Sequence, residues 1–252
     1  MLTDEELERY ARQILLPDFD IAGQERLRRA RVLVLGLGGL GSPVALYLAA
    51  AGVGELVLAD GDAVSLSNLQ RQVIHAHADC GGNKARSAAR SIARLNPLVS
   101  CTTIAQQLDE AALQQQVAAV DLVVDGSDNY PTRFALNRAC IAHRVPLVSA
   151  AAVRAEGQLA VFDPARGGPC YRCLYPEAGA SSALSCSESG VLGPAVGVMG
   201  SLQALEALKR LSGFGEPLKN TLLMVDFATL QMERLALARR AGCPDCEGLT
   251  GA

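Results

Sequence analysis

Several features that mark large classes of proteins are missing from this sequence. No run of about 18 or more uninterrupted apolar residues occurs, which excludes a membrane-spanning helix. Basic residues are not in excess, since 23 Lys and Arg stand against 26 Asp and Glu and the net charge is -3. A chain of this charge has no general attraction for nucleic acid or anionic membranes, so we expect neither among its partners.

The N-terminal stretch MLTDEELERYARQ also lacks the basic start and apolar core of a secretion signal. We therefore expect a cytoplasmic protein in a reducing compartment, where paired cysteines hold metal more often than they form disulfides. Only three histidines are present, and His75, His77 and His143 show neither a catalytic triad pattern nor metal-ligand spacing. We expect structural roles for them.

The alternation of apolar runs with helical segments predicts an α/β fold with a doubly wound, mostly parallel, Rossmann-like sheet. Antiparallel strands are expected after residue 151, where the alternation stops. Helices are predicted over residues 4–13, 24–30, 41–51, 84–95, 110–119, 132–144 and 195–211. Strands are predicted from the runs RVLVLG, ELVLAD, CTTIA, DLVVD, PLVSAA, GQLAVFDP, TLLMVDF and LQMERLAL. The stretch EAGASSALSCSESG has the composition of a mobile loop.

A glycine-rich motif follows the first predicted strand. Gly36, Gly38 and Gly41 fit the G-x-G-x-x-G template between a strand and a helix, where backbone amides can approach a phosphate. Asp60 ends the next strand 19 residues beyond Gly41, at the position of an acid that accepts hydrogen bonds from a ribose. Taken alone, this motif favours an NAD-binding enzyme.

The polar residues around this motif favour a triphosphate instead. Asn68, Arg71 and Gln72 lie in the stretch SLSNLQRQ, Lys84 begins a helix, and Asp128 follows a strand in DGSDN. Cationic side chains neutralise phosphate charge, and a carboxylate at the carboxyl edge of a parallel sheet can hold Mg²⁺. Because such loops converge on one crevice, ATP with Mg²⁺ is the nucleotide that this group predicts.

Four of the eight cysteines form two pairs, CYRC and CPDC. Each pair presents two thiolates at the spacing used in tetrahedral zinc sites, so we expect one structural Zn²⁺. Its ligands would be Cys170, Cys173, Cys243 and Cys246. Redox-active pairs are the alternative, but no thioredoxin-like strand pattern accompanies them. The unpaired cysteines Cys80, Cys101 and Cys140 are expected to pack as small apolar residues.

These motifs, in this order, resemble the MoeB/ThiF family of adenylyltransferases related to ubiquitin-activating enzymes. The similarity covers nearly the whole chain and includes RYARQ, GLGGLGS, LADGDAVSLSNLQRQ, GGNKARSA, DGSDN, CYRC, GVLGPAVGVMGSLQALEALK and CPDC. The resemblance implies one adenylation domain over residues 1–252. Its parts would be N-terminal helices (1–30), a nucleotide-binding half (31–151) and a carrier-binding half with the zinc site (152–252).

The resemblance also implies a reaction, in which the C-terminal glycine of a ubiquitin-like sulfur carrier ending in Gly-Gly attacks the α-phosphate of ATP. Gly39 would lie in the phosphate loop, and Asn68, Arg71 and Lys84 would contact phosphates. Asp128 would hold Mg²⁺. The nucleotide would also be bound by Gly36, Gly38, Gly41, Asp60, Ser67, Gln72 and Asn129. Arg12 would reach into the partner subunit's site, which requires a homodimer.

The carrier implied first is the small subunit of molybdopterin synthase, and the thiamine-pathway carrier is the alternative. Cys186 occupies a position where some relatives form a thioester or persulfide, although adenylation does not require it. No rhodanese-like extension follows Cys246, so a separate protein is expected to donate the sulfur.

Two hypotheses of other classes stay open at this point. An NAD-dependent oxidoreductase explains the glycines and Asp60 but gives no role to Arg71, Lys84, Asp128 or the cysteine pairs. A noncatalytic carrier-binding scaffold explains the fold and the cysteines, but we would expect it to have lost one of those three polar residues. All three are present.

Overall fold

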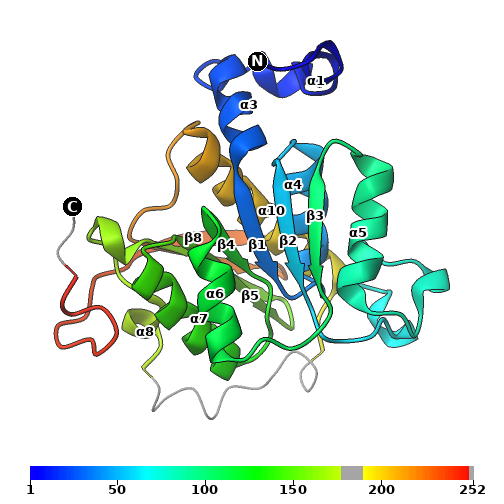
Figure 1. The fold of residues 1–252 in the computed structure, drawn as a ribbon. Helices are drawn as coiled ribbons and strands as arrows, with labels where there is room; N and C mark the ends of the chain where they lie inside the picture. Colours follow the sequence, from blue (N-terminus) through cyan, green and yellow to red (C-terminus); the bar gives the residue numbers. More distant parts are fainter. Residues whose placement is uncertain (177–189, 250–252) are drawn as a thin grey trace.

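The computed structural model describes residues 1–176 and 190–249. Its centre is one eight-stranded sheet with the strand order β3-β2-β1-β4-β5-β6-β7-β8 (Figure 1). The first five strands in the chain pair in parallel, and the last three pair antiparallel. The predicted α/β architecture with a change of direction after residue 151 is therefore confirmed.

The parallel part of the sheet forms from short apolar runs that are buried on both faces. Its strands are β1 (Arg31–Leu35), β2 (Glu55–Ala59), β3 (Ser100–Ile104), β4 (Leu122–Asp125) and β5 (Leu147–Val153). Four consecutive residues of β1, β2 and β4 are buried, as expected for strands covered on both sides by helices. Only β3, at the edge, is largely exposed.

The antiparallel part continues from β5 without a break. Its strands are β6 (Glu156–Phe162), β7 (Thr221–Asp226) and β8 (Gln231–Ala236). Burial falls along this series, because β6 is mostly buried whereas all six residues of β8 are exposed. One edge of the sheet in the described part of the chain is therefore open to solvent.

Helices cover both faces of the sheet, which gives two separate cores (Figure 1). One face packs against α3 (Asp20–Arg29), α4 (Gly41–Ala50), α5 (Lys84–Leu95) and α10 (Gly193–Ser212). The other packs against α6 (Glu110–Ala118), α7 (Tyr130–His143) and the short α8 (Tyr171–Leu174). Val32 and Val34 point into the first core and Leu33 and Leu35 into the second, as the two-residue period of a strand requires.

The N-terminal helices differ from their predicted bounds. The helix expected over residues 4–13 is divided into α1 (Asp4–Arg9) and α2 (Ala11–Ile14), because Tyr10 leaves helical geometry with ψ near 8°. Tyr10 is buried, and its hydroxyl accepts a hydrogen bond of 2.8 Å from Asn96 Nδ2. The predicted capping box between Thr3 and Glu6 is present. A long-range contact at Tyr10 thus accounts for a break that local sequence did not reveal.

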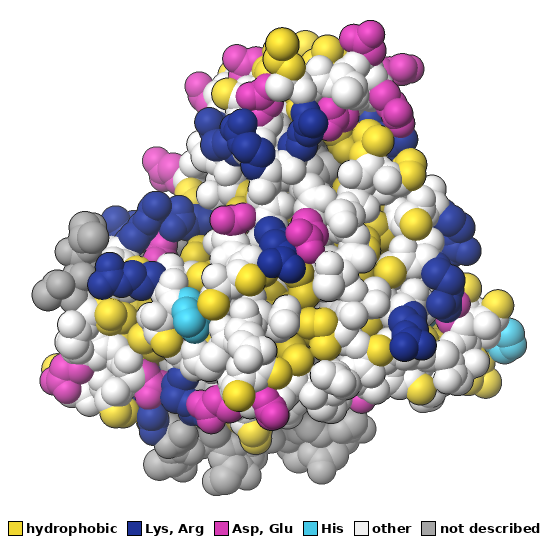
Figure 2. Space-filling view, viewed as in Figure 1, with side chains coloured by type: hydrophobic (Ala, Val, Ile, Leu, Met, Phe, Trp, Pro, Cys, Tyr) yellow, Lys and Arg dark blue, Asp and Glu magenta, His cyan; other side chains and the backbone are white. Residues whose placement is uncertain are grey.

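One face of the molecule carries charges of both signs in mixture (Figure 2). On the face drawn in Figure 2, Lys and Arg side chains alternate with Asp and Glu and do not merge into one basic surface. None of the helices in residues 1–176 and 190–249 is long and apolar enough to cross a membrane.

Candidate active site

A cleft of about 470 Å³ lies at the carboxyl ends of the parallel strands, where loops after β1, β2 and β4 meet β5 and β6. Nine residues that the sequence nominated for nucleotide binding or catalysis line this cleft. They are Gly36, Gly38, Gly39, Asp60, Arg71, Gln72, Lys84, Asp128 and Asn129. The edge of a parallel sheet is the usual place for a ligand in this architecture.

The glycine-rich loop depends on close backbone contacts. Gly36 has a φ of 85°, and a Cβ on it would lie 2.8 Å from the carbonyl of Gly126. A Cβ on Gly41 would lie 1.9 Å from the Gly36 oxygen. Neither position tolerates a side chain. In the first turn of the helix α4 that follows, the Ser42 N–H donates to the Gly38 carbonyl at 2.9 Å and Pro43 has no N–H, so the amides that could approach a phosphate are those of the glycine-rich loop itself.

The backbone N–H and carbonyl of Leu37 each form a hydrogen bond with a side chain from another segment. Asp60 Oδ2 accepts a hydrogen bond of 2.8 Å from the Leu37 N–H. The Leu37 carbonyl accepts one of 3.0 Å from His75 Nε2, so the Nδ1 of His75 accepts from Ser87 Oγ at 2.8 Å. His75 is buried, and burial lowers the pKa of its imidazole. His75 therefore has a structural role, and it acts directly on the glycine-rich loop.

Two cationic side chains from the segment between β2 and the start of α5 line the cleft. Lys84, the first residue of α5, is 7% exposed, and its Nζ lies 2.8 Å from Asp62 Oδ2. Arg71 is half-buried and donates to the Ser67 carbonyl at 3.2 Å. Gln72 also lines the cleft, and its buried side-chain oxygen has no hydrogen-bond partner within the described residues. An acceptor left unpaired at a cleft wall is available to a ligand.

A carboxylate and an amide lie on the β4–α7 turn. Asp128 is exposed and lines the cleft, and within residues 1–176 and 190–249 its carboxylate has no recorded hydrogen bond or ion pair. Asn129 caps α7, since its Oδ1 accepts from the Thr132 N–H at 3.0 Å. The Asp128 carboxylate is thus free to bind a ligand. Because hard cations prefer oxygen ligands, such a cation would suit this position.

Four residues nominated from the sequence do not line this cleft. Gly41 lies behind the loop, against Gly36. Ser67 and Asn68 belong to a 3₁₀ turn (Leu66–Asn68) and bond within it, Asn68 accepting from the Ser65 N–H at 3.4 Å. Arg12 is exposed on α2 and does not reach the cleft of its own chain.

Sequence reasoning missed two buried charged residues beside the Asp128 turn. Arg133 is 8% exposed and lines the cleft, and its Nε lies 3.8 Å from Oδ2 of the fully buried Asp125. Burial disfavours the charged guanidinium, but the Asp125 carboxylate together with Tyr171 and Tyr175 outweighs it, so the pKa of Arg133 is raised. Asp62 was also missed, although an acid two residues after Asp60 was a signal that could have drawn attention to it.

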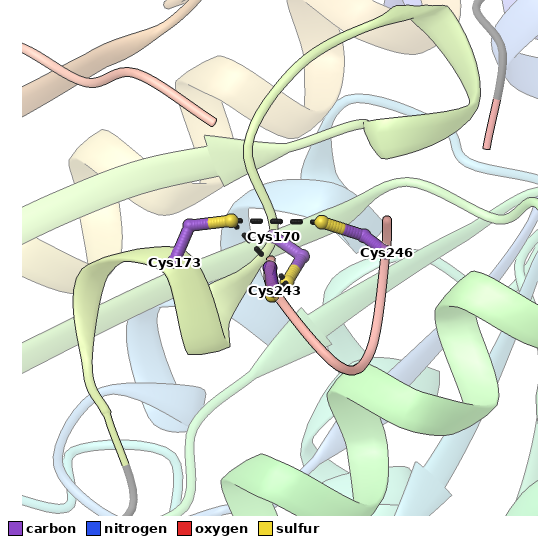
Figure 3. A group of neighbouring side chains, drawn as sticks. All are labelled: Cys170, Cys173, Cys243 and Cys246. Atoms are coloured by element: carbon purple, nitrogen blue, oxygen red, sulfur yellow. Dashed lines mark hydrogen bonds between the residues drawn. The ribbon is translucent and has the colours of Figure 1, made fainter. Parts of the chain in front are cut away.

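The two cysteine pairs meet at one point between α8 and the C-terminal segment (Figure 3). The sulfurs of Cys170 and Cys243 are 3.7 Å apart, those of Cys170 and Cys173 3.8 Å, and those of Cys173 and Cys246 3.5 Å. A tetrahedral Zn²⁺ with bonds of about 2.3 Å would place its sulfurs about 3.8 Å apart. The cluster could hold a metal ion.

The other cysteines differ in their surroundings. Cys140 is buried, and its burial raises the pKa of its thiol, as expected for a small core residue. Cys80 is exposed, so the expectation that it packs in an apolar environment is wrong. It lies in the loop before α5, where no element covers it. Cys186, and with it most of the stretch predicted to be a mobile loop, falls outside the described residues.

A comparison with protein families matches residues 10–245 to the ThiF family. The chain belongs to the ThiF family. This confirms the resemblance found in the motifs. The matched residues include all those that line the cleft and three of the four cluster cysteines, and Cys246 is the first residue after the match.

Curated relatives of this ThiF-family chain have specific names. Molybdopterin-synthase adenylyltransferase of Escherichia coli is 49% identical over 97% of this chain and 98% of the relative. The sulfur carrier protein ThiS adenylyltransferase of the same organism is 47% identical over 98% of each. The chain is thus similar along its length to adenylyltransferases of two named kinds.

Solved structures of similar fold include Escherichia coli MccB. Its complex with MccA-N7isoASN has a TM-score of 0.83 and 25% identity, covering 96% of this chain and 75% of that one. Its complex with ATP has a TM-score of 0.79 and 25% identity, covering 90% and 69%.

Proposed function

We propose that the protein adenylylates the C-terminal glycine of a small ubiquitin-like sulfur carrier. A carboxylate oxygen of that glycine attacks the α-phosphorus of ATP. The new P–O bond joins AMP to the carrier as an acyl adenylate, and the bond from the α-phosphorus to the bridging oxygen breaks, so that pyrophosphate leaves. The carboxylate is thereby converted into an activated acyl group.

One observation carries this proposal: the glycine loop, two cations and a free carboxylate line the same cleft. The backbone amides of the glycine loop suit the phosphates of a nucleotide. Lys84 and Arg71 are placed to offset charge that develops on the phosphates during the attack. An NAD-dependent oxidoreductase would leave these cations and Asp128 without a function.

The opposite wall suits a narrow peptide. It is formed where β5 meets β6, by Ala151, Ala152 and Gly157. A Cβ on Gly157 would lie 2.5 Å from Sδ of the buried Met199, so glycine here lets β6 pack closely against α10, and the side chains that the wall presents at Ala151 and Ala152 are single methyl groups. A carrier tail ending in Gly-Gly is the type of chain that such a wall admits.

The metal assignments follow from the chemistry of the donors. Asp128 would hold Mg²⁺, which would supply positive charge to offset that of the leaving pyrophosphate. The four-cysteine cluster would hold Zn²⁺ in a coordinatively closed site with a structural role. The cluster joins α8 to the C-terminal segment, and none of its cysteines lines the cleft.

The position of Arg12 supports a homodimer with shared sites. It is exposed and outside its own cleft, and apolar side chains near it on the same N-terminal segment are exposed too. Leu15 is 73% exposed and Ile21 47% exposed. A second copy that covers this surface would bring Arg12 toward the partner's ATP.

Carrier-dependent pyrophosphate exchange tests the proposal. Purified protein with MgATP and labelled pyrophosphate should form labelled ATP only with an intact Gly-Gly carrier. We expect the small subunit of molybdopterin synthase to be preferred, with the thiamine-pathway carrier as the second candidate because relatives of both kinds are similar to this chain. A separate protein would supply the sulfur. Absence of exchange with both carriers, or reduction of bound NAD, would contradict the proposal.

A further inference from the structure

The cleft opens where two parallel strands separate. β4 and β5 pair from Val123 with Leu147 as far as Asp125 with Ser149, and there the pairing ends. The chain after β4 turns away through residues 126–129 into α7, whereas β5 continues to Val153 beside β6. We call this point of separation the fork. Residues after it line the cleft from both arms.

Arg133 joins the two arms of the fork from the α7 side. Its Nη2 donates to the Ser127 carbonyl at 2.6 Å and to the Ala150 carbonyl at 3.2 Å. Ser127 precedes Asp128 on one arm, and Ala150 precedes the small-residue wall on the other. A single nitrogen therefore spans the fork.

Asp125 holds the first arm from below. Its Oδ1 accepts from the N–H of Ser127 at 2.9 Å and from the Ser127 hydroxyl at 2.6 Å. Its Oδ2 accepts from Ser149 Oγ at 2.8 Å. Because the N–H, hydroxyl and carbonyl of Ser127 are all bonded, the residue next to Asp128 has little freedom to move.

The opposite face of the sheet carries a second bridge. Gln203 of α10 is fully buried, and its Nε2 donates to the Asp125 carbonyl at 2.8 Å and to the Val148 carbonyl at 3.3 Å. The base of the fork is thus fixed by Gln203, and the arms beyond it are joined by Arg133.

We propose that Arg133 is a positioning residue that sets the separation between the Asp128 arm and the Ala151–Ala152 arm. The inference rests on the proposed function, in which one arm serves MgATP and the other the carrier tail. Their separation then sets the distance between the α-phosphorus and the attacking carboxylate. A displacement of about 1 Å in such an arrangement can lower a rate by about a hundredfold.

Arginine suits this position better than lysine. Its planar guanidinium presents two donors from one nitrogen to two carbonyls, while Nε faces the Asp125 carboxylate. Lysine keeps the positive charge but concentrates it at a single flexible point, and so cannot reproduce that geometry. Arg133→Lys therefore preserves the charge and removes the bridge.

The test compares Arg133→Lys with Arg138→Lys, a control on the same helix whose guanidinium bonds the exposed Glu110. Binding of MgATP alone and of the carrier alone should change by less than about threefold in Arg133→Lys, because each arm persists. At saturating ligands, kcat for pyrophosphate exchange should fall by more than about tenfold. The control should match the wild type in all three measurements.

Amide hydrogen exchange supplies a readout that does not depend on activity. In Arg133→Lys the amides of residues 127–129 and 151–152 should exchange faster than in the wild type, while those of β1 stay protected. If amide hydrogen exchange is faster in Arg133→Lys but the wild type catalyses no pyrophosphate exchange, the proposed function is contradicted and the role of Arg133 at the fork is not. Amide hydrogen exchange at the fork that is unchanged in Arg133→Lys, or a kcat for pyrophosphate exchange equal to that of the wild type, would overturn this inference. If Arg133→Lys does not fold, Ser149→Ala removes one bond of the same fork and should show the same pattern at smaller amplitude.

Discussion

Lys84 Nζ lies 2.8 Å from Asp62 Oδ2, and both residues line the cleft at the carboxyl ends of the parallel strands. The lysine is 7% exposed, whereas the Asp62 side chain is 59% exposed. The buried Lys84 is thus held in place by the more exposed carboxylate of Asp62. Gln107 donates to the other Asp62 oxygen at 3.3 Å, which helps to fix the orientation of the carboxylate.

This pair predicts different effects for its two members. Lys84→Ala removes a charge at the phosphates and should lower kcat for pyrophosphate exchange by about a hundredfold or more. Asp62→Asn keeps the positive charge of Lys84 but holds its ammonium group less firmly, so kcat should fall by about tenfold. Steady-state exchange kinetics measure both. Glu110→Gln, which breaks an exposed ion pair with Arg138 outside the cleft, is the control, and equal losses in Asp62→Asn and this control would refute the anchoring role.

The shared-site proposal predicts complementation between inactive variants. Arg12→Ala and Lys84→Ala homodimers each lack one group in both sites and should be nearly inactive. After subunit exchange, about half of the dimers are mixed and have one intact site, so about a quarter of wild-type exchange should return. If Arg12 acted within its own chain, no mixture would recover activity even with proven mixed dimers.

The cysteine cluster predicts that metal content and stability change together. Cys243→Ser should lower bound zinc, measured by elemental analysis, and the midpoint of thermal unfolding, because metal binding free energy contributes to folding. Cys80→Ser is the matched control, since Cys80 is exposed and outside the cluster. Full zinc occupancy in Cys243→Ser would remove this assignment.

Buried His75 predicts a dependence of stability on pH. Burial lowers its pKa in the folded protein, so the unfolded chain binds this proton more readily. The free energy of unfolding is unaffected by this group above its ordinary pKa of about 6.5 and falls as the pH drops below that value. Urea unfolding between about pH 7.5 and 5.5 should show a smaller decrease for His75→Gln than for the wild type. The same change at exposed His77 should have no such effect, and parallel curves for all three proteins would contradict the prediction.

The fold was predictable because its signals are local. Short apolar runs and the glycine motif identify the segments that form the parallel strands, and the cysteine spacing identifies the cluster. The helix break at Tyr10 was not predictable, since it depends on Asn96, which lies 86 residues away in the chain.

The cleft was predictable in part for the same reason. Residues that follow the carboxyl ends of strands, such as Lys84 and Asp128, converge by topology alone. Arg133 was not recognised, and His75 was expected to be structural but without a location, because their roles arise from backbone carbonyls of other segments, and a carbonyl has no signature in the sequence.

The meeting of the two cysteine pairs has a mechanical consequence. Cys170 and Cys243 stand 73 residues apart in the chain but 3.7 Å apart at their sulfurs. An ion that joins all four sulfurs converts the chain between them, including α10, β7 and β8, into a closed ring. Tension applied at the two ends of the protein would then pass through the metal–sulfur bonds and bypass the exposed strand β8. In a single-molecule pulling experiment, protein from which a chelator has removed the metal should therefore extend further than the metal-loaded protein. The difference should equal the extended length of the chain within the ring.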